Sequence, residues 1–258
     1  MNLLLADGTN IVMRYAFAML GSRQTHPDDL DIERVCGSVE WALWRVAEKV
    51  SATHSVVCFD SEGETWRKAL YPDYKKSRPP GTSAWSKRAT EWLEGRNWKC
   101  ASVQGFEGDD VVATMTRRAV SAGHMAWVFS GDQDLLQLVD VADVIQFGGK
   151  DEEKYAIRSP IHLANKFKVA TAAEFTIFKA LVGDSGDEIP GCRGIGPVRA
   201  GKLIAKYGHE IDDMLGAEID IDPDQFQLML QLVSLRTDVP IEPMKPAECR
   251  VPARRGEG

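Results

Sequence analysis

Short apolar runs alternate with longer amphipathic segments over the first 160 residues of the chain. Four of these runs have the length and composition of buried strands: residues 3–6, 55–59, 126–130 and 144–147. Between them, residues 32–50 and 109–122 repeat apolar side chains at helical spacing. Strands that alternate with helices predict an α/β fold with a mostly parallel sheet. Beyond this region only helical patterns continue, and they predict an all-helical lobe: residues 172–182, 197–207 and 223–233.

Nine carboxylates lie at the ends of predicted strands or at the starts of turns. They are Asp7, Asp60, Glu107, Asp109, Asp110, Asp132, Asp134, Asp184 and Asp187. The carboxyl ends of parallel strands line one crevice, so we expect these groups to converge there. Like charges raise one another's pKa, so such a cluster needs a compensating cation, and clusters of oxygen ligands hold Mg²⁺ or Mn²⁺ in proteins. The pattern indicates a metal-dependent enzyme acting on phosphate esters.

The distribution of charge favours a polyanionic partner, although the net charge is −7. Without the nine clustered acids the balance is −7 + 9 = +2. Residues 66–99 hold nine basic side chains against three acidic ones, and residues 193–206 hold four basic side chains and no acid. Basic segments beside an acidic metal pocket suit a nucleic acid held for cleavage. Charge alone leaves open that these segments are solvated helix faces.

Several other classes of protein are disfavoured by composition. The sequence has no run of about 18 apolar residues and no signal peptide at its start, so we expect no membrane association. The cysteines are scattered and form no CxxC pair: Cys36, Cys58, Cys100, Cys192 and Cys249. Reduced thiols in the cytoplasm are the expectation. The five histidines show no metal-ligand spacing.

A glycine-rich segment contains two candidate motifs. Residues 196–202 fit the pattern of a phosphate-binding P-loop, but Leu203 stands where that motif needs a hydroxyl and no strand precedes it, so we reject a nucleotide site. The better interpretation is a tight turn over residues 194–196 that leads into a helix at Pro197, whose first amides bind a DNA phosphate. Such a helical hairpin holds duplex backbone without reading bases. A glycine turn that merely joins two helices is the alternative.

Five sequence blocks occur in a specific order over residues 1–235. They are Leu-Ala-Asp7-Gly; Phe-Asp60 with Arg67 and Tyr74-Lys75-x-x-Arg78; Glu107-Gly-Asp109-Asp110; Ser-Gly-Asp132-Gln-Asp134-Leu-Leu-Gln-Leu; and Leu-Val-Gly-Asp184-Ser-Gly-Asp187-Glu-Ile-Pro-Gly followed by Gly-Ile-Gly-Pro. In this order the chain resembles the 5′-nuclease superfamily, which includes flap endonucleases, phage 5′-exonucleases and the 5′-nuclease domain of bacterial DNA polymerase I. Each block alone is a weak signal, whereas the ordered set is specific.

The resemblance implies a domain plan and an activity. It implies a PIN-like (resolvase-like) α/β nuclease domain over residues 1–160, with an arch at about 75–98 that admits a single strand. A helix–three-turn–helix lobe would follow over residues 161–237, and residues 238–258 would form an extended, partly disordered tail. The implied activity is Mg²⁺-dependent hydrolysis of DNA phosphodiesters near 5′ ends.

Carried over by position, the resemblance distributes the carboxylates over two metal ions, Mg²⁺ or Mn²⁺. The first ion would be bound by Asp7, Asp60, Glu107 and Asp109. The second would be bound by Asp132, Asp134, Asp184 and Asp187, with Asp109 bridging and Asp110 close by. Two ions about 3.5–4 Å apart activate water and stabilise the leaving oxygen of an in-line displacement.

Further roles follow from the same resemblance. The catalytic group would comprise Lys75 and Arg78, one helical turn apart and aimed at the scissile phosphate, together with Arg67 and Tyr74. Tyr74 would stack on a terminal base or position the basic pair. DNA contacts are expected from Arg193, Gly194, Gly196, Arg199, Lys202, Lys87 and Arg88. The backbone carbonyls of Gly194, Ile195 and Gly196 keep open a K⁺ site near the DNA.

Two departures from the superfamily pattern bear on the site. Glu188 stands where the superfamily usually has asparagine, and Val198 stands where it usually has a phosphate-contacting lysine. We expect Arg199 to replace that lysine from the next position, which changes how the DNA is anchored.

The sequence therefore predicts a free-standing 5′-3′ exonuclease or 5′-flap endonuclease of replication or repair. Because Met1 immediately precedes the first strand and nothing follows residue 258, we expect no fused polymerase domain. We also expect a monomer, with a separate DNA polymerase as its partner. Two alternatives stay open. A PIN-type ribonuclease shares the acidic sheet but typically lacks the helix–three-turn–helix block. A DNA-binding protein that keeps the fold without catalysis should have lost some of the nine acids.

Overall fold

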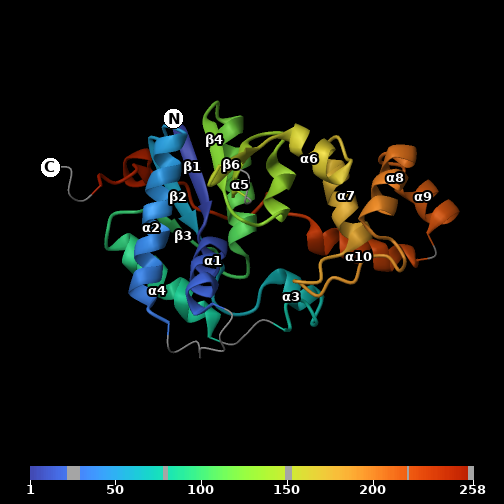
Figure 1. Cartoon of the computed structure of the whole chain (residues 1–258), viewed down its shortest axis with the longest axis horizontal. Coiled ribbons are helices and arrows are strands. Elements are labelled where there is room, and N and C mark those ends of the chain that lie inside the picture. Colours follow the sequence, from blue (N-terminus) through green and yellow to red (C-terminus); the bar gives the residue numbers. More distant parts are fainter. Residues whose placement is uncertain (22–29, 78–80, 149–152, 220, 255–258) are drawn as a thin grey trace.

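A six-stranded sheet flanked by helices forms the centre of the molecule (Figure 1). The structure, a computed structural model, describes residues 1–21, 30–77, 81–148, 153–219 and 221–254. The strands are β1 (Asn2–Asp7), β2 (His54–Cys58), β3 (Cys100–Ala101), β4 (Met125–Phe129), β5 (Asp143–Phe147) and β6 (Tyr155–Arg158). Their order in space is β3-β2-β1-β4-β5-β6, and every neighbouring pair is parallel except β5 and β6. The mostly parallel sheet is confirmed.

The register of β1 brings three strand ends to one level. Asp7, the last residue of β1, pairs with Cys58 at the end of β2. On the other side of β1, Ala6 pairs with Phe129 at the end of β4. The segments that leave β1, β2 and β4 therefore begin side by side at one edge of the sheet, where the sequence places its acidic residues.

Helices cover both faces of the sheet. Leu4 and Leu5, neighbours in β1, enter hydrophobic cores on opposite faces, which explains the unbroken apolar composition of this strand. One core is closed by α1 (Gly8–Leu20), α2 (Ile32–Lys49) and α4 (Thr82–Glu94), which pack on one another. On the other face α5 (Gly108–Ser121) packs against β1 and β4. Of the helices in the described residues, none combines the length and the apolar character needed to cross a membrane.

The segment expected to form an arch contains helix α4. Trp85, Ala89 and Leu93 recur every four residues on one face of α4, and all three are buried against α1 and α2. The short helix α3 (Trp66–Leu70) precedes this region. Residues 78–80, which include the predicted catalytic Arg78, lie outside the described residues.

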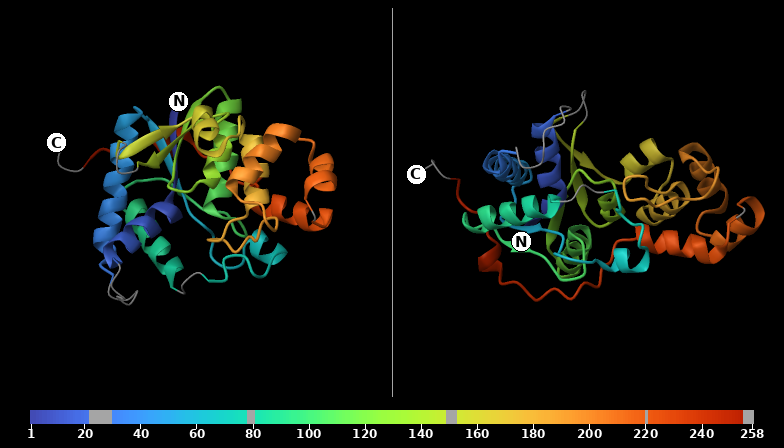
Figure 2. Two further views of the ribbon diagram at one scale, coloured as in Figure 1. Left: turned by 45° about the vertical axis from the view of Figure 1, so that its right-hand side comes forward. Right: turned by 90° about the horizontal axis from the view of Figure 1, so that it is seen from below.

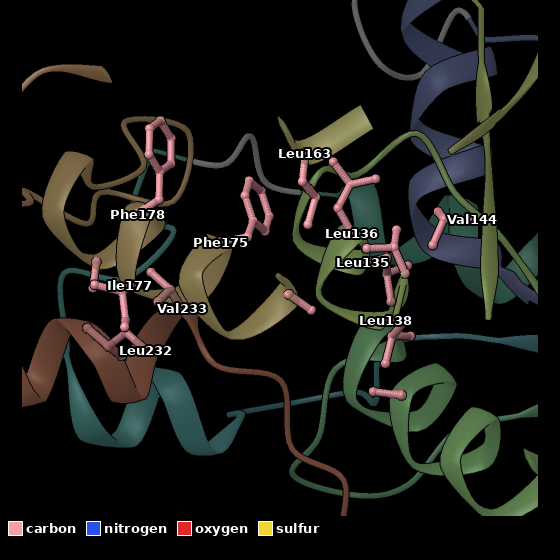
Figure 3. Packing of buried hydrophobic residues seen from close by; sticks show 14 of the residues in the cluster. Leu135, Leu136, Leu138, Val144, Leu163, Phe175, Ile177, Phe178, Leu232 and Val233 are labelled. Atoms are coloured by element: carbon pink, nitrogen blue, oxygen red, sulfur yellow. The ribbon is translucent and has the colours of Figure 1, made fainter. Parts of the chain in front are cut away.

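The helical lobe packs against the sheet domain through a shared core. Its helices are α6 (Pro160–Phe167), α7 (Ala172–Val182), α8 (Pro197–Tyr207), α9 (Ile211–Glu218) and α10 (Pro223–Val233). Helix α7 is central, because it contacts α6, α8 and α10 as well as the 3-10 turn η2 (Asp134–Leu138) that follows β4. Figure 3 shows leucines of η2 and phenylalanines of α7 in this common core, and the views of Figure 2 place the lobe at one end of the molecule.

The last segment runs back from the lobe to the sheet domain, and Figure 2 shows its course. Val239, Ile241 and Cys249 are buried, and Arg118 donates hydrogen bonds to the carbonyls of Val239 (2.8 Å) and Ile241 (2.7 Å). Near its end, the Trp44 indole donates to the Pro252 carbonyl at 3.0 Å. The backbone is extended as expected, apart from the 3-10 turn η3 (Pro246–Cys249), but through residue 252 it is docked on the domain. Residues 255–258 lie outside the described residues.

Candidate active site

Asp7 links the end of β1 to the start of α1. One carboxylate oxygen caps α1 by accepting the Asn10 amide at 3.0 Å, and the other accepts the Ser130 hydroxyl at 2.8 Å. Burial raises the pKa of Asp7 to about 7, and the charges of Asp60 and Asp132 add to the shift. Three predicted ligands from three strand ends therefore interact, and a nearby cation would relieve their repulsion.

The Glu-Gly-Asp-Asp block allows α5 to start against the end of β2. A Cβ atom on Gly108 would lie only 3.1 Å from the Cys58 carbonyl oxygen, so glycine permits this close approach. The Gly108 amide donates to an Asp60 carboxylate oxygen at 2.7 Å. Asp60 and the acids of the first turn of α5 are thereby fixed relative to each other.

The acids after β4 are ordered by short local hydrogen bonds. The Ser130 hydroxyl accepts the Asp132 amide at 3.0 Å, and an Asp132 carboxylate oxygen accepts the Asp134 amide at 2.9 Å. Burial raises the pKa of Asp134 to about 7, with a further contribution from Asp132, although the ammonium group of Lys179 at 2.8 Å opposes the shift.

Asp184 and Asp187 lie in a tight turn after α7 rather than at a strand end. Gly183 and Gly191 close this turn with φ of 78° and 66°, and a Cβ on either would come within about 2.5 Å of the opposing backbone. Lys179 lies one turn before the end of α7, and its ammonium group pairs with Asp184 as well as with Asp134. Lys179 was not among the predicted site residues, although a lysine within the apolar run of α7 is a sequence signal that could have revealed it.

Lys75 and Tyr74 face the carboxylates from the loop after α3. The Lys75 ammonium lies 2.6 Å from a Glu107 oxygen and 3.6 Å from Asp187. The Tyr74 hydroxyl lies 2.9 Å from Glu107 and 3.1 Å from Asp187. Burial alone would raise the pKa of Glu107, but the charges of Lys75 and Arg67 lower it to about 2.

Of the two roles expected for Tyr74, stacking on a base does not fit, because Tyr74 is only 3% exposed and its hydroxyl is hydrogen-bonded. Positioning the basic pair agrees with the Lys75 ammonium, which lies 4.7 Å from the centre of the Tyr74 ring. Residues 72–77 form turns and Lys75 has a left-handed φ of 51°, so the chain at Lys75 is not helical. Tertiary hydrogen bonds shape this loop, including one from the Lys75 amide to the Asp187 carbonyl at 3.1 Å.

Arg67 and Asp110 form a buried pair behind the site. Arg67 is 2% exposed and Asp110 is 0% exposed, and two guanidinium nitrogens donate to the Asp110 carboxylate at 2.8 and 2.9 Å. Asp110 also accepts the Trp66 indole and the Arg236 amide, both at 2.8 Å. These donors occupy both carboxylate oxygens of Asp110, so Asp110 does not fit its predicted place among the metal ligands. Arg67 contacts Glu107 at 2.6 Å from inside the protein, which makes it a positioning residue rather than a substrate contact.

Asp109 differs from its neighbour in α5. Its side chain is partly accessible and lies 3.5 Å from Arg67. Burial raises the pKa of Asp109 well above its ordinary value, and the charges of Asp110 and Glu107 add to the effect of burial while Arg67 and Lys75 oppose it. The role of Asp109 as a ligand shared between two cations stays a prediction.

A cavity of about 960 Å³ opens between the carboxylates and helix α4. Asp60, Glu107 and Lys75 line its inner end, and Lys87 lines the α4 side. Lys87 lies 3.4 Å from Glu62, whereas Arg88 pairs with Glu91 and with Glu33 of α2. Of the two basic residues predicted on α4, only Lys87 therefore lines the cavity.

The glycine turn before α8 presents an exposed surface on the helical lobe. Ile195, proposed only for the K⁺ site, is buried beneath the turn, whereas the DNA contacts predicted here are exposed: Arg193, Gly194, Gly196, Arg199 and Lys202. Arg199 donates to the Glu218 carbonyl at 2.9 Å, and its other terminal nitrogen lies 3.5 Å from the Gly194 carbonyl. Val198, where the lysine is usual, is 75% exposed.

A parallel sheet with acids at its strand ends, joined to a helical hairpin lobe, defines a resolvase-like nuclease fold. Sequence models of two domains match the chain: the 5′-3′ exonuclease N-terminal resolvase-like domain over residues 2–168, and the 5′-3′ exonuclease C-terminal SAM fold over residues 170–255. The chain belongs to the 5′-3′ exonuclease family.

Relatives of two lengths match the chain. DNA polymerase I of Rhizobium leguminosarum is 33% identical over 93% of this chain, which spans 25% of that protein. The chain thus covers about a quarter of the length of the polymerases it matches. The flap endonuclease Xni of Shewanella amazonensis is 28% identical over 96% of this chain and 98% of its own length.

Solved structures confirm the fold. A mutant of T5 5′-exonuclease has a TM-score of 0.64 at 22% identity, covering 90% of this chain and 84% of that chain. The catalytic core of Rad2 in complex with DNA substrate has a TM-score of 0.59 at 13% identity, covering 92% of this chain and 79% of that chain.

Proposed function

We propose that this chain is a metal-dependent 5′-nuclease that hydrolyses DNA phosphodiesters near 5′ ends, as a 5′-3′ exonuclease and a 5′-flap endonuclease. The observation that carries the proposal is the convergence of Asp7, Asp60 and Asp132 at the ends of three adjacent strands. The match to a protein named flap endonuclease along nearly its whole length supports it. We further propose a monomer that acts in the cytoplasm, in replication or repair, beside a separate DNA polymerase.

The donor chemistry fits two Mg²⁺ or Mn²⁺ ions. The carboxylates supply only oxygen ligands, and the raised pKa values of Asp7 and Asp134, both about 7, reflect how strongly these buried groups need a compensating charge. Among the described residues no group of three or more acidic, histidine or cysteine side chains is arranged closely enough to hold an ion. Lys75 and Lys179 instead pair with four of the acids. We infer that some carboxylates turn from these lysines toward the ions on binding.

We assign the acids to the two ions as the superfamily resemblance implies, except that Asp110 is left out of the ligand set. Asp7, Asp60, Glu107 and Asp109 would hold one ion, and Asp132, Asp134, Asp184 and Asp187 the other, whereas Asp110 supports α5. A structure of T5 5′-exonuclease carries bound zinc, which supports divalent ions in this fold. Bound ions would supply Lewis-acid activation of water and of the leaving group.

The residues of this chain would contribute orientation and charge to the reaction. The cavity under α4 admits the 5′ strand, and Lys75 at its inner end stabilises negative charge that develops on the phosphate. Tyr74 holds the Glu107 and Asp187 carboxylates 2.9 and 3.1 Å from its hydroxyl. Arg67 fixes Glu107 from behind.

Lys75→Met should slow the chemical step far more than it weakens DNA binding. A preorganised cation contributes about 2–4 kcal/mol to transition-state stabilisation, which corresponds to a loss of about 30- to 1000-fold in single-turnover rate. Lys76→Met is the matched control, because the neighbouring Lys76 is exposed and its ammonium group pairs with Asp73 on the surface instead of with Glu107. A loss of affinity with an unchanged single-turnover rate would make Lys75 a binding residue only.

The turn before α8 is proposed to hold the duplex flank of the substrate. Exposed amides at Gly194 and Gly196, with Arg193, Arg199 and Lys202, offer sequence-independent phosphate contacts. Arg199, oriented by the Glu218 carbonyl, supplies the cation that Val198 lacks. We include in this proposal a K⁺ ion at the carbonyls of residues 194–196.

Arg199→Ala should weaken binding to a flapped or nicked duplex much more than binding to a single strand. The slope of log affinity against log salt should become shallower by about one unit, because one phosphate contact is lost. Val198→Lys is the opposite test, since an exposed side chain there can restore the usual contact, and it should tighten duplex binding. Equal effects on duplex and single strand would remove the duplex-anchoring role.

The proposed activity is tested by the products it makes. A 5′-labelled flap, a nicked duplex and a single strand are digested side by side with Mg²⁺ or Mn²⁺, each with a DNA and an RNA 5′ strand. We expect cleavage of the flap near its junction and short products from the nick, with the plain single strand cut slowly. Preferential cleavage of single-stranded RNA would support the PIN-type ribonuclease instead.

A further inference from the structure

The turn that carries Asp187 and the loop that carries Lys75 are joined by two consecutive hydrogen bonds. The Lys75 amide donates to the Asp187 carbonyl at 3.1 Å. The Ser77 amide donates to a carboxylate oxygen of Glu188 at 3.0 Å. The first bond joins two backbone groups, so any residue at position 187 could form it. The second bond requires a side chain at position 188 that is long enough to reach the Ser77 amide.

Glu188 occupies a backbone conformation that does not suit it. Its φ is 57°, in the left-handed region, where glutamate is strained and asparagine is tolerated best among residues with side chains. This chain therefore holds a less favourable residue in the turn, and the feature that glutamate adds is its reach to the Ser77 amide.

The bond from Glu188 is placed where it controls the position of Lys75. Lys75 also has a left-handed φ, 51°, and its loop is not part of a helix or strand. The ammonium of Lys75 nevertheless lies 2.6 Å from Glu107. Fixing the chain at the Lys75 amide and again two residues later at Ser77 holds this strained residue in the geometry that directs its ammonium to the carboxylates.

We propose that Glu188 is a positioning residue for Lys75: its carboxylate latches the Lys75 loop to the turn of Asp184 and Asp187. The latch joins a loop of the sheet domain to a turn of the helical lobe, so it also keeps the two sets of acids in register. The inference rests on the proposed nuclease function for its kinetic consequence, but the latch itself is a structural contact.

Three substitutions of Glu188 separate the effects of its side-chain length, its negative charge and its backbone strain. Glu188→Gln keeps the length and an acceptor oxygen, so it should cleave a 5′-labelled flap at the wild-type single-turnover rate. Glu188→Asn relieves the strain but is one carbon too short, so we expect a rate about tenfold lower with the dissociation constant for DNA within twofold. Its thermal midpoint should equal or exceed that of the wild type. Glu188→Ala should be equally slow.

Lys168→Asn is the matched control for strain. Lys168 follows α6 with a left-handed φ of 62°, and it is remote in sequence from the carboxylates. This variant should gain stability as Glu188→Asn does, with no change in cleavage rate. A rate for Glu188→Asn equal to the wild-type rate, or for Glu188→Gln as low as that for Glu188→Asn, would overturn the latch.

A measurement without catalysis separates this inference from the proposed function. Hydrogen exchange at the amides of residues 75–77 should be at least tenfold faster in Glu188→Asn than in the wild type or Glu188→Gln. If the wild type does not cleave DNA, the proposed function fails and the latch is judged on exchange alone. Unchanged exchange in Glu188→Asn would refute it whatever the activity.

Discussion

Asp7→Asn is expected to lower the single-turnover cleavage rate by at least about three orders of magnitude, equivalent to about 4 kcal/mol of transition-state stabilisation. Asparagine keeps the cap on α1, because its side-chain oxygen can still accept the Asn10 amide, but it removes the charge that a metal ion needs. Burial and neighbouring charges raise the pKa of Asp7 to about 7, so the ionised carboxylate is unfavourable in the metal-free protein.

The same substitution should leave folding intact. Because the pKa of Asp7 is raised in the folded state, the protein loses stability as the pH rises from the unfolded-state pKa near 3.8 toward 7. Asparagine stays neutral, so the variant does not undergo this loss. In chelator at pH 8, Asp7→Asn should therefore unfold at or above the wild-type temperature. Asp31→Asn, which alters the equivalent cap of α2, is the matched control and should retain full activity. Inactivity caused by unfolding of Asp7→Asn would refute this account of Asp7.

Arg67→Met should reduce the free energy of unfolding by about 3–5 kcal/mol, because it leaves the buried Asp110 carboxylate without its charged partner. The guanidinium also donates to the carbonyls of Leu232 at 2.9 Å and Ser234 at 3.1 Å, so it ties α10 to the site. Denaturant unfolding in chelator measures the loss. Adding Asp110→Asn should recover part of it, since the fully buried charge at position 110 is then removed together with its partner.

Arg118→Met is the control for loss of a guanidinium that donates to backbone carbonyls instead of to a buried carboxylate. Arg118 holds the segment after α10 through Val239 and Ile241, and its loss should cost about 1–3 kcal/mol. If Arg67→Met costs no more than Arg118→Met, the buried ion pair is not what stabilises the junction between sheet domain and lobe.

The regular elements were predictable because local patterns determine them. The helices at 172–182, 197–207 and 223–233 have the predicted limits, and the strands at β1, β2, β4 and β5 are confirmed. The two-residue β3 carries too few side chains for a pattern. The segment after Asp238 was expected to be partly disordered because it is rich in proline, yet Val239 and Ile241 are buried. Proline content predicts an extended backbone but not whether that backbone docks.

The sequence predicted which residues gather at the site more readily than it predicted what each of them does there. The sequence distinguishes neither Asp109 from Asp110 nor Lys75 from Arg67, because burial by α10 and by the lobe decides which groups are sealed inside. Lys179 of α7 also pairs with Asp134 of η2, which is far from it in sequence, and no local spacing reveals this contact. The roles of individual acids as metal ligands stay predictions.

We expect the acidic edge of the sheet to hydrolyse DNA only with divalent ions. The most direct test is the single-turnover rate on one 5′-labelled flap in Mg²⁺, in chelator, and after Mg²⁺ is restored, for the wild type and Asp7→Asn. The wild type should cleave rapidly, lose this activity in chelator and regain it with Mg²⁺, and Asp7→Asn should be at least about a thousandfold slower. Wild-type cleavage that continues at full rate in chelator would contradict this expectation.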